Sequence, residues 1–278
     1  MCCRFLLMND HARALLARLG ATLEARLAAE TARTEADGGG EGDCATEFVS
    51  RYNIAPGSRI LAVRSAAAQG AATGDGGTRD GVREAVRLRW GLVPSWARSS
   101  GGSGQGRGAS PVNARAESVA EKPMFRDALR QRRCVILASG FYEWERRGGA
   151  RLPWLFQRAD GEPFLLAGLW DSWRPPDGGA LESCTMITTA ANAVMAPIHH
   201  RMPVMLSATE AEEWLEPRVT PMSRMATLTS LLHPWDEAMT AAVRVSTRVN
   251  NARFEGPECL DAPPPGEGGA DAQMSLVF

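Results

Sequence analysis

Hydrophobic residues recur at helical spacing near the start of the chain and at strand-like spacing through most of the remainder. Leucines follow one another at three- and four-residue steps from Leu16 to Leu27, with Arg and Glu between them. This spacing predicts an amphipathic helix over residues 10–35, and the run of glycines after Asp37 brings it to an end.

Beyond this helix, alternating or short apolar runs predict a succession of short β-strands. The strands are expected at residues 59–65, 84–92, 134–145, 153–158, 164–171, 184–189, 202–206 and 243–248. Short helices are expected to start at Thr209 and near Met222. The Gly-rich stretches 66–82 and 99–110 are expected to be flexible loops.

This order of elements predicts the fold class and the domain organisation. Strands outnumber helices and do not alternate regularly with them, which favours the α+β class with a mainly antiparallel sheet core and peripheral helices. The 278 residues suffice for one large domain. We expect this domain at residues 1–260, followed by a disordered tail over 261–278 that begins rich in Pro, Gly and Asp.

Composition narrows the classes of function. The formal net charge is −1, so a nucleic acid would have to bind through locally clustered Arg rather than through overall charge. The six Cys include no CxxC pair, and neither a metal site nor a cofactor is predicted. No leader and no apolar run near 18 residues is seen, which predicts a cytoplasmic protein with reduced thiols and no membrane partner.

Cys2 carries the most distinctive chemistry of the chain. A small residue after the initiator Met favours removal of that Met, which would leave Cys2 with a free α-amine and a thiol on one residue. The pKa of an α-amine lies near about 7.7–8.0, so an appreciable fraction is a neutral nucleophile near pH 7. Such an amine condenses with an aldehyde to a Schiff base, on which the thiol closes a thiazolidine ring. The alternative is that position 2 is merely small and buried.

Five later segments combine reactive side chains with turn-forming or aromatic residues. They are Arg51 to Gly57, Trp90 to Trp96, Asn113 to Glu117, Gly140 to Trp144 and Ile198 to Pro203. Each also allows a structural interpretation. The Trp residues can belong to the core, the Glu of the fourth segment can face solvent, the His pair can be structural, and the Asn of the third segment can stabilise a turn.

Taken in order, these segments resemble the SRAP (SOS-response-associated peptidase) family, whose sequences begin Met-Cys-Gly-Arg-Phe. Met1 to Phe5 departs from that start only at Cys3. Ala167 to Trp170 and Val249 to Asn251 match two further blocks of the family, so the resemblance spans residues 2–260.

The resemblance implies a DNA-repair protein of the SOS response that crosslinks abasic sites in single-stranded DNA and acts in association with the nucleoid. By similarity, the amine of Cys2 attacks the C1′ aldehyde of the opened sugar, and its thiol closes the ring. Glu143 and His199 match proton-transfer residues of the family. Asn113 matches an amide that holds the Cys2 amine and the sugar.

The resemblance also implies contacts to the DNA strand. Arginines are expected to bind phosphates through their forked guanidinium groups, and tryptophans are expected to stack on bases or wedge beside the lesion. The DNA-contacting residues expected on this basis are Arg4, Asn53, Trp90, Trp96, Arg115, Thr188 and Arg201.

Two positions depart from the family pattern. Cys3 stands where the family has Gly and adds a second thiol beside the nucleophile, and His200 stands where bacterial members often have an acid. Two other functions remain open at this point. One is a cysteine peptidase with Cys2 as its amino-terminal nucleophile, acting on other peptides or only in autoprocessing. The other is a non-covalent binder of single-stranded DNA.

The end of the chain carries a separate motif. Its last six residues resemble the bacterial hexapeptide Gln-Leu-x-Leu-x-Phe that docks on the replication sliding clamp. The residues that match or stand in for the motif are Gln273, Met274, Leu276 and Phe278. A tethered peptide of this kind would predict the sliding clamp as a second partner, whereas the alternative is an apolar end that packs on the domain.

Overall fold

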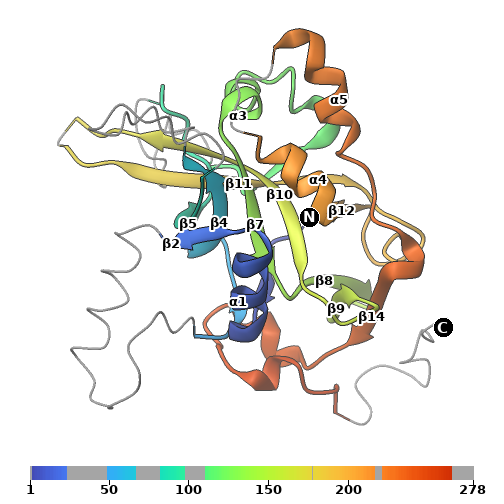
Figure 1. The fold of residues 1–278 in the computed structure, drawn as a ribbon. Coiled ribbons are helices and arrows are strands. Elements are labelled where there is room, and N and C mark those ends of the chain that lie inside the picture. Colours follow the sequence, from blue (N-terminus) through green and yellow to red (C-terminus); the bar gives the residue numbers. More distant parts are fainter. Residues whose placement is uncertain are drawn as a thin grey trace.

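Two β-sheets bordered by short helices form the fold of the computed structural model, which describes residues 2–23, 49–66, 82–97, 110–176, 178–216 and 221–264. In Figure 1, β8, β9 and β14 lie together at the lower right, whereas β2, β4 and β5 lie on the left. Helix α3 lies at the upper centre of the picture and α4 and α5 lie to its right, whereas α1 lies below them.

The smaller sheet holds five of the described strands. Their order is β14 (Thr240–Arg244), β9 (Ala150–Arg158), β8 (Gly140–Arg147), β1 (Phe5–Leu7) and β3 (Arg51–Ile54). All pairs in this sheet are antiparallel, and the amino-terminal strand β1 lies between β8 and β3. This placement brings the second residue of the chain to one end of the sheet.

The larger sheet holds nine of the described strands and closes on itself through a pairing of β11 with β5. Its main path is β12 (Arg201–Pro203), β11 (Leu181–Ala190), β10 (Phe164–Trp173), β7 (Arg133–Ala138), β4 (Arg59–Ser65), β5 (Arg83–Trp90) and β2 (Ala21–Leu23). β13 (Met205–Leu206) pairs with β10, and β6 (Asn113–Arg115) pairs with β11. The prediction of an α+β domain with a mainly antiparallel core is confirmed.

Short helices border the sheets. The α-helices are α1 (Asn9–Arg18), α3 (Arg126–Gln131), α4 (Ala208–Trp214) and α5 (Met225–Ser230), and 3-10 turns include η2 (Ala116–Ser118), η3 (Met222–Arg224), η4 (Glu237–Met239), η5 (Thr247–Asn250) and η6 (Pro257–Cys259). Ser207 and Glu210 form a reciprocal capping box at the start of α4, which satisfies two backbone N–H groups. None of the helices in the described ranges is long and apolar enough to cross a membrane.

The prediction of a helix over residues 10–35 is wrong after its first part. α1 ends at Arg18, and Gly20 follows with a φ of 56°, a left-handed conformation that ends helices and that glycine adopts without strain. Residues 21–23 then pair with β5 as strand β2. The leucine spacing fitted a helix, but pairing with an existing strand prevailed over that local preference. Residues 24–35 lie outside the described part of the chain.

The strand predicted over residues 134–145 is two strands in two different sheets. β7 ends at Ala138 and β8 begins at Gly140, with Ser139 between them. The Ser139 hydroxyl accepts a hydrogen bond from the Met8 backbone N–H at 2.8 Å and lies 2.9 Å from Nδ1 of His11. The chain changes sheet where Ser139 ties it to the start of α1.

Gly140 is required by close packing. A Cβ at this position would lie 2.9 Å from the carbonyl oxygen of Phe156, so any larger residue would separate β8 from β9. The neighbouring ring of Phe141 stacks on Phe156 with centroids 5.2 Å apart. The aromatic segment that follows Gly140 is thereby pressed into the smaller sheet, and this fixes the position of Glu143.

Other predicted strand boundaries differ less from those in the structure. The last predicted strand, 243–248, begins earlier and is wrong beyond Arg244, because the chain turns into η5 at Thr247. The run 202–206 is divided into β12 and β13. Strands β1, β3 and β6 were not predicted. The greater part of both predicted Gly-rich loops and the clamp-like hexapeptide lie outside the described residues.

Candidate active site around Cys2

Cys2 is fully buried at the end of the smaller sheet. Its Sγ lies 3.7 Å from the carbonyl oxygen of Arg4, and its own carbonyl accepts a hydrogen bond from Nδ2 of Asn113 at 2.8 Å. Burial raises the pKa of the Cys2 thiol well above its usual value, and Glu143 adds to this effect. The sulfur is therefore a neutral thiol near pH 7, held in place by main-chain contacts.

Glu143 lies on β8 beside the start of the chain. Phe5 pairs with Phe141, and the Tyr142 N–H donates to the carbonyl of Arg4 at 3.0 Å, so continuing this register brings position 3 opposite Glu143. Glu143 is 4 % exposed, and burial raises the pKa of its carboxyl. The positive amino terminus acts in the opposite direction. A carboxyl near the amino end with a raised pKa can exchange protons near neutral pH.

Asn113 is positioned by strand β6. This strand pairs in parallel with β11, with Asn113 opposite Met186. The amide nitrogen of Asn113 holds the Cys2 carbonyl, while its Oδ1 is buried without a hydrogen-bond partner. A buried acceptor left unpaired costs about 1–3 kcal/mol, so this oxygen is available to a donor such as an ammonium group.

His199 lies just before β12, half-buried and stacked on His200 with ring centroids 4.5 Å apart. The Arg201 backbone N–H donates to Nδ1 of His199 at 3.0 Å. Nδ1 also lies 3.2 Å from the carbonyl oxygen of Arg201. In the tautomer in which Nδ1 accepts from the Arg201 N–H, the proton of the neutral ring resides on Nε2. Burial lowers the pKa of His199, and the amino-terminal charge lowers it further. The charge at the amino end of the chain thus acts on both His199 and Glu143.

Arg201 is held by protein groups. Its guanidinium forms two hydrogen bonds with the Glu117 carboxylate, and its Nη2 also donates to the carbonyl of Thr188. Only 11 % of the side chain is exposed. A DNA phosphate would have to share a guanidinium that is already paired. The sequence predicted that Arg201 contacts DNA and predicted no role for Glu117, although both residues lie in segments that match the family.

Asn53 is also engaged inside the protein. Its Oδ1 accepts from Arg4 at 2.7 Å, and its Nδ2 donates to the carbonyls of Asn251 at 3.0 Å and Phe254 at 2.8 Å. The residue is 2 % exposed. The prediction that Asn53 contacts DNA is therefore wrong in this structure, because its amide is used to hold Arg4 against the carboxy-terminal segment.

The two predicted stacking tryptophans have different environments. Trp90 is fully buried, donates to the carbonyl of Val112 at 2.8 Å, and packs edge-on against Phe5 with centroids 5.3 Å apart. The prediction that Trp90 stacks on bases is wrong, since no face of its ring is accessible. Trp96 is 60 % exposed in the turn after β5 and keeps an open ring surface.

The remaining predicted residues lie on adjacent strands. Thr188 is buried on β11 opposite Arg115, and its hydroxyl donates to the carbonyl of Ala114 at 3.3 Å. Arg115 is exposed and forms no ion pair with any described residue. The structure thus brings Cys2, Asn113 and Glu143 together, with Arg115 within two residues of Asn113.

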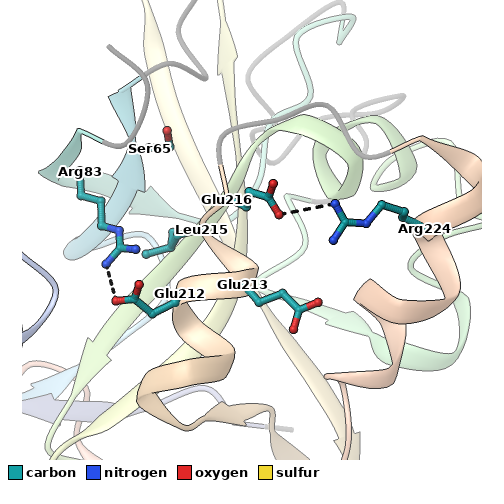
Figure 2. Close-up of a pocket in the computed structure, with 7 residues that line it drawn as sticks. All are labelled: Ser65, Arg83, Glu212, Glu213, Leu215, Glu216 and Arg224. Atoms are coloured by element: carbon teal, nitrogen blue, oxygen red, sulfur yellow. Dashed lines mark hydrogen bonds and ion pairs between the residues drawn. The ribbon is translucent and has the colours of Figure 1, made fainter.

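A pocket elsewhere contains none of the predicted site residues. It has a volume of about 330 Å³ and is lined by Ser65, Arg83, Glu212, Glu213, Leu215, Glu216 and Arg224. Figure 2 shows that its arginines lie beside acidic residues: Arg83 pairs with Glu212 at 2.9 Å, and Arg224 lies 3.8 Å from Glu216. The described residues contain no cluster of His, Cys, Asp and Glu that could hold a metal ion.

Comparison with protein families finds one family model that matches most of the chain. The model is described as SOS response associated peptidase (SRAP) and matches residues 1–252. The match covers all the catalytic residues predicted above, from Cys2 to His199, together with the expected DNA-contacting arginines.

Several curated relatives are similar over most of the chain. The abasic site processing protein YoqW of Bacillus subtilis is 36% identical over 218 residues, which is 78% of this chain and 88% of the relative. The abasic site processing protein YoaM of the same organism is 37% identical over 78% of this chain and 86% of its own. The abasic site processing protein HMCES of Gallus gallus is 35% identical, and the match covers 64% of this chain and 57% of that protein.

Solved structures of the same shape are known. A crystal structure of a protein from Bacteroides thetaiotaomicron superposes with a TM-score of 0.71 at 23% identity, covering 94% of this chain and 99% of that one. A second, from Bordetella bronchiseptica, gives a TM-score of 0.63 at 24% identity over 88% of this chain and all of its own. These likenesses support the fold.

Proposed function

The chain belongs to the SOS response associated peptidase family, and from this membership we propose that it processes abasic sites in DNA by trapping them covalently on Cys2. The proposal extends to this chain the activity that its relatives' names state. The observation that carries it is the convergence of Asn113 and Glu143 on Cys2 at the amino end of the chain.

The proposed reaction begins with removal of Met1, which frees the α-amine of Cys2. The amine attacks the C1′ aldehyde of a ring-opened abasic sugar in single-stranded DNA and forms a carbinolamine. Loss of one water gives a Schiff base. The Cys2 thiol then adds to the same carbon, and its proton passes to the nitrogen. One C–N and one C–S bond form for each water released, and the product is a thiazolidine.

Neighbouring groups suit these steps. A protonated Glu143 can donate to the departing hydroxyl of the carbinolamine, which is consistent with a pKa raised by burial. Oδ1 of Asn113, buried and unpaired, can accept a hydrogen bond from the Cys2 amine. In the tautomer in which Nδ1 accepts from the Arg201 N–H, Nε2 of His199 can donate a proton to the sugar oxygen during ring opening.

The direction of the Cys2 pKa bears on the peptidase alternative. A cysteine peptidase attacks through a thiolate, whereas burial and the nearby Glu143 oppose ionisation of this thiol. In the proposed reaction the amine attacks first, and the thiol adds intramolecularly to an activated carbon, so that a pre-formed thiolate is not required. These considerations favour aldehyde trapping over peptide hydrolysis.

The test uses an oligonucleotide with a single abasic site. We expect the purified protein to form an adduct that survives denaturing electrophoresis, Cys2→Ala to abolish it, and Cys3→Ala to retain it. Cys3 is the matched control, because it is the adjacent thiol but has no free α-amine. An adduct that persists in Cys2→Ala refutes the assignment, and cleavage of unrelated peptides without an adduct supports the peptidase.

The carboxy-terminal hexapeptide supports a second, separate proposal about partners. Residues 273–278 resemble a sliding-clamp peptide and lie outside the described part of the structure. We expect their deletion to abolish binding to the bacterial clamp in a pull-down with purified proteins, without changing adduct formation. Equal clamp binding by the truncated and full-length chains would refute this proposal.

A further inference from the structure

Near its tip, the β8–β9 hairpin carries two exposed arginines, Arg146 and Arg151, that form no ion pair with any described residue. Arg146 on β8 is directly opposite Arg151 on β9, and Trp144 is opposite Pro153. Residues that face each other across an antiparallel pair, and residues two apart on one strand, share one face of a sheet. Trp144, Arg146 and Arg151 therefore lie on the same face.

Arg4 joins this face from the amino-terminal segment. Its guanidinium lies 5.8 Å from the centre of the Trp144 ring, and that of Arg151 lies 5.2 Å from the same ring. Asn250 holds the indole in place. The indole N–H donates to Oδ1 of Asn250 at 2.5 Å, and Nδ2 of Asn250 donates to the Arg151 carbonyl at 3.2 Å. Trp144 thus acts as a fixed support for two guanidinium groups.

These charges are not neutralised by the protein. Arg4, Arg146 and Arg151 form no ion pair with any described residue. The nearby carboxylate of Glu145 is on the opposite face of β8, where it accepts from Arg147 at 2.7 Å and from Trp154 at 3.1 Å. Burial lowers the pKa of Arg4, and the charge of Arg151 lowers it further. An anion between these groups would relieve their repulsion.

We propose that Arg146 and Arg151, together with Arg4 on the Trp144 ring, form a subsite for the phosphodiester backbone of a single-stranded nucleic acid. The inference rests on the proposed function for its choice of ligand, since Arg4 lies two residues from Cys2 in the sequence. Guanidinium forks bind phosphate oxygens in pairs. The subsite would hold the strand that flanks the lesion while Cys2 reacts.

An acidic peptide is the competing ligand, and the position of the subsite argues against it. Continuing the pairing of Phe5 with Phe141 places Cys2 level with Trp144, and β8 runs on past this point to Arg147. Arg146 and its partner Arg151 therefore lie beyond Cys2 at the same end of the smaller sheet. A DNA strand that presents its sugar to Cys2 must leave the site past this tip or past Arg115 on the other side. An acidic peptide is not anchored at Cys2, so nothing would direct it past this tip.

The experiment measures binding of fluorescein-labelled oligo(dT) without an abasic site to Cys2→Ala protein, so that no covalent step contributes. Kd is determined between 50 and 300 mM NaCl for the Cys2→Ala protein and for the same protein with either Arg146→Ala or Arg151→Ala. Each should raise Kd about five-fold and reduce the slope of log Kd against log salt by about 0.7, the value for one lost phosphate contact on a single strand. Arg151→Lys should recover most of the slope.

Arg126→Ala is the matched control, because it removes one exposed positive charge from α3, where Asp127 lies 3.9 Å away. An unchanged slope in Arg146→Ala and Arg151→Ala, or the same change in Arg126→Ala, overturns the subsite. Displacement of the DNA by poly-glutamate at matched charge assigns the site to acidic peptides and also overturns it. If the slope changes but abasic DNA gives no adduct, the subsite stands and the proposed trapping reaction fails.

Discussion

The surroundings of Cys2 and the pocket between α4 and β5 both gather charged side chains, but they arrange them in opposite ways. In the pocket, Arg83 pairs with Glu212 and Arg224 lies near Glu216, so opposite charges offset each other. Around Cys2, burial opposes ionisation of the thiol and of Glu143, and Arg4, Arg146 and Arg151 form no ion pair with any residue that the structure describes. Groups with shifted pKa values and arginines without acidic partners among the described residues distinguish the surroundings of Cys2 from the pocket.

The largest contrast is expected between two equivalent substitutions of Glu. Glu143→Gln should slow adduct formation about 100-fold or more, because the variant loses its general acid. Glu213→Gln, which makes the same change in the pocket, should leave the rate within two-fold. Timed quenching and gel electrophoresis with an abasic oligonucleotide measure both rates, and equal rates in the two variants would remove Glu143 from the mechanism.

The pH profile sharpens this first prediction. Because burial raises the pKa of Glu143, the acid form persists to higher pH than in an ordinary Glu, and the wild-type rate should fall as pH rises through that pKa. Glu143→Gln should lack this decline. Because this pKa is higher in the folded state than in the unfolded state, the contribution of Glu143 to stability is lost as the pH rises through the folded-state pKa. Glu143→Gln should therefore raise Tm at pH 8, by about 2–4 °C for each 1 kcal/mol gained.

The next contrast separates the two tryptophans that the sequence treated alike. Trp96→Ala should weaken binding of undamaged oligo(dT) about ten-fold through loss of one stacking surface, with Tm unchanged. Trp90→Ala should destabilise the fold by about 3–5 kcal/mol, because a buried ring is lost. Anisotropy and urea unfolding measure these effects. A stable Trp90→Ala protein with selectively weakened DNA binding would contradict the burial of that ring.

A smaller effect is expected from Glu117, which pairs with Arg201 and thereby fixes the backbone that holds His199. Glu117→Ala should slow adduct formation several-fold and let His199 exchange between tautomers, whereas Glu117→Gln should keep part of both properties. The ¹⁵N chemical shifts of the His199 ring report the tautomer directly. A slowed reaction with an unchanged tautomer would show that Glu117 acts by another route.

The smallest effect is expected in the pocket itself. Arg224→Ala removes a partly exposed pair whose contribution to stability is about 0–1 kcal/mol. Adduct formation should be unchanged within error, and Tm should shift by no more than a few degrees. Loss of adduct formation in a stably folded Arg224→Ala protein would mean that the pocket takes part in the reaction.

Ordered motifs in the sequence were sufficient to predict the fold class and the group around Cys2. The residues that matter most lie in segments with distinctive local composition, such as Gly140 to Trp144, and their order along the chain is informative. The α+β class follows from the number and shortness of the apolar runs. These features are local, and local patterns are visible in a single sequence.

What could not be predicted depends on tertiary pairing. A sequence motif does not show whether a polar side chain forms hydrogen bonds within the protein or contacts a ligand. Asn53 and Arg201 were therefore predicted to contact DNA, although both form hydrogen bonds inside the protein. Trp90 and Trp96 differ in the same way. The cluster of Trp144, Arg146 and Arg151 was missed, because its charges meet only through the register of β8 with β9.

Intact-mass spectrometry of the reaction with abasic DNA tests the role of Cys2 most directly. The expected adduct has the mass of the protein without Met1 plus that of the oligonucleotide, less one water, and it forms without a reducing agent. Peptide mapping should locate the DNA on residue 2. An adduct that retains Met1, that lies on any other residue, or that requires reduction to survive would contradict the proposed thiazolidine.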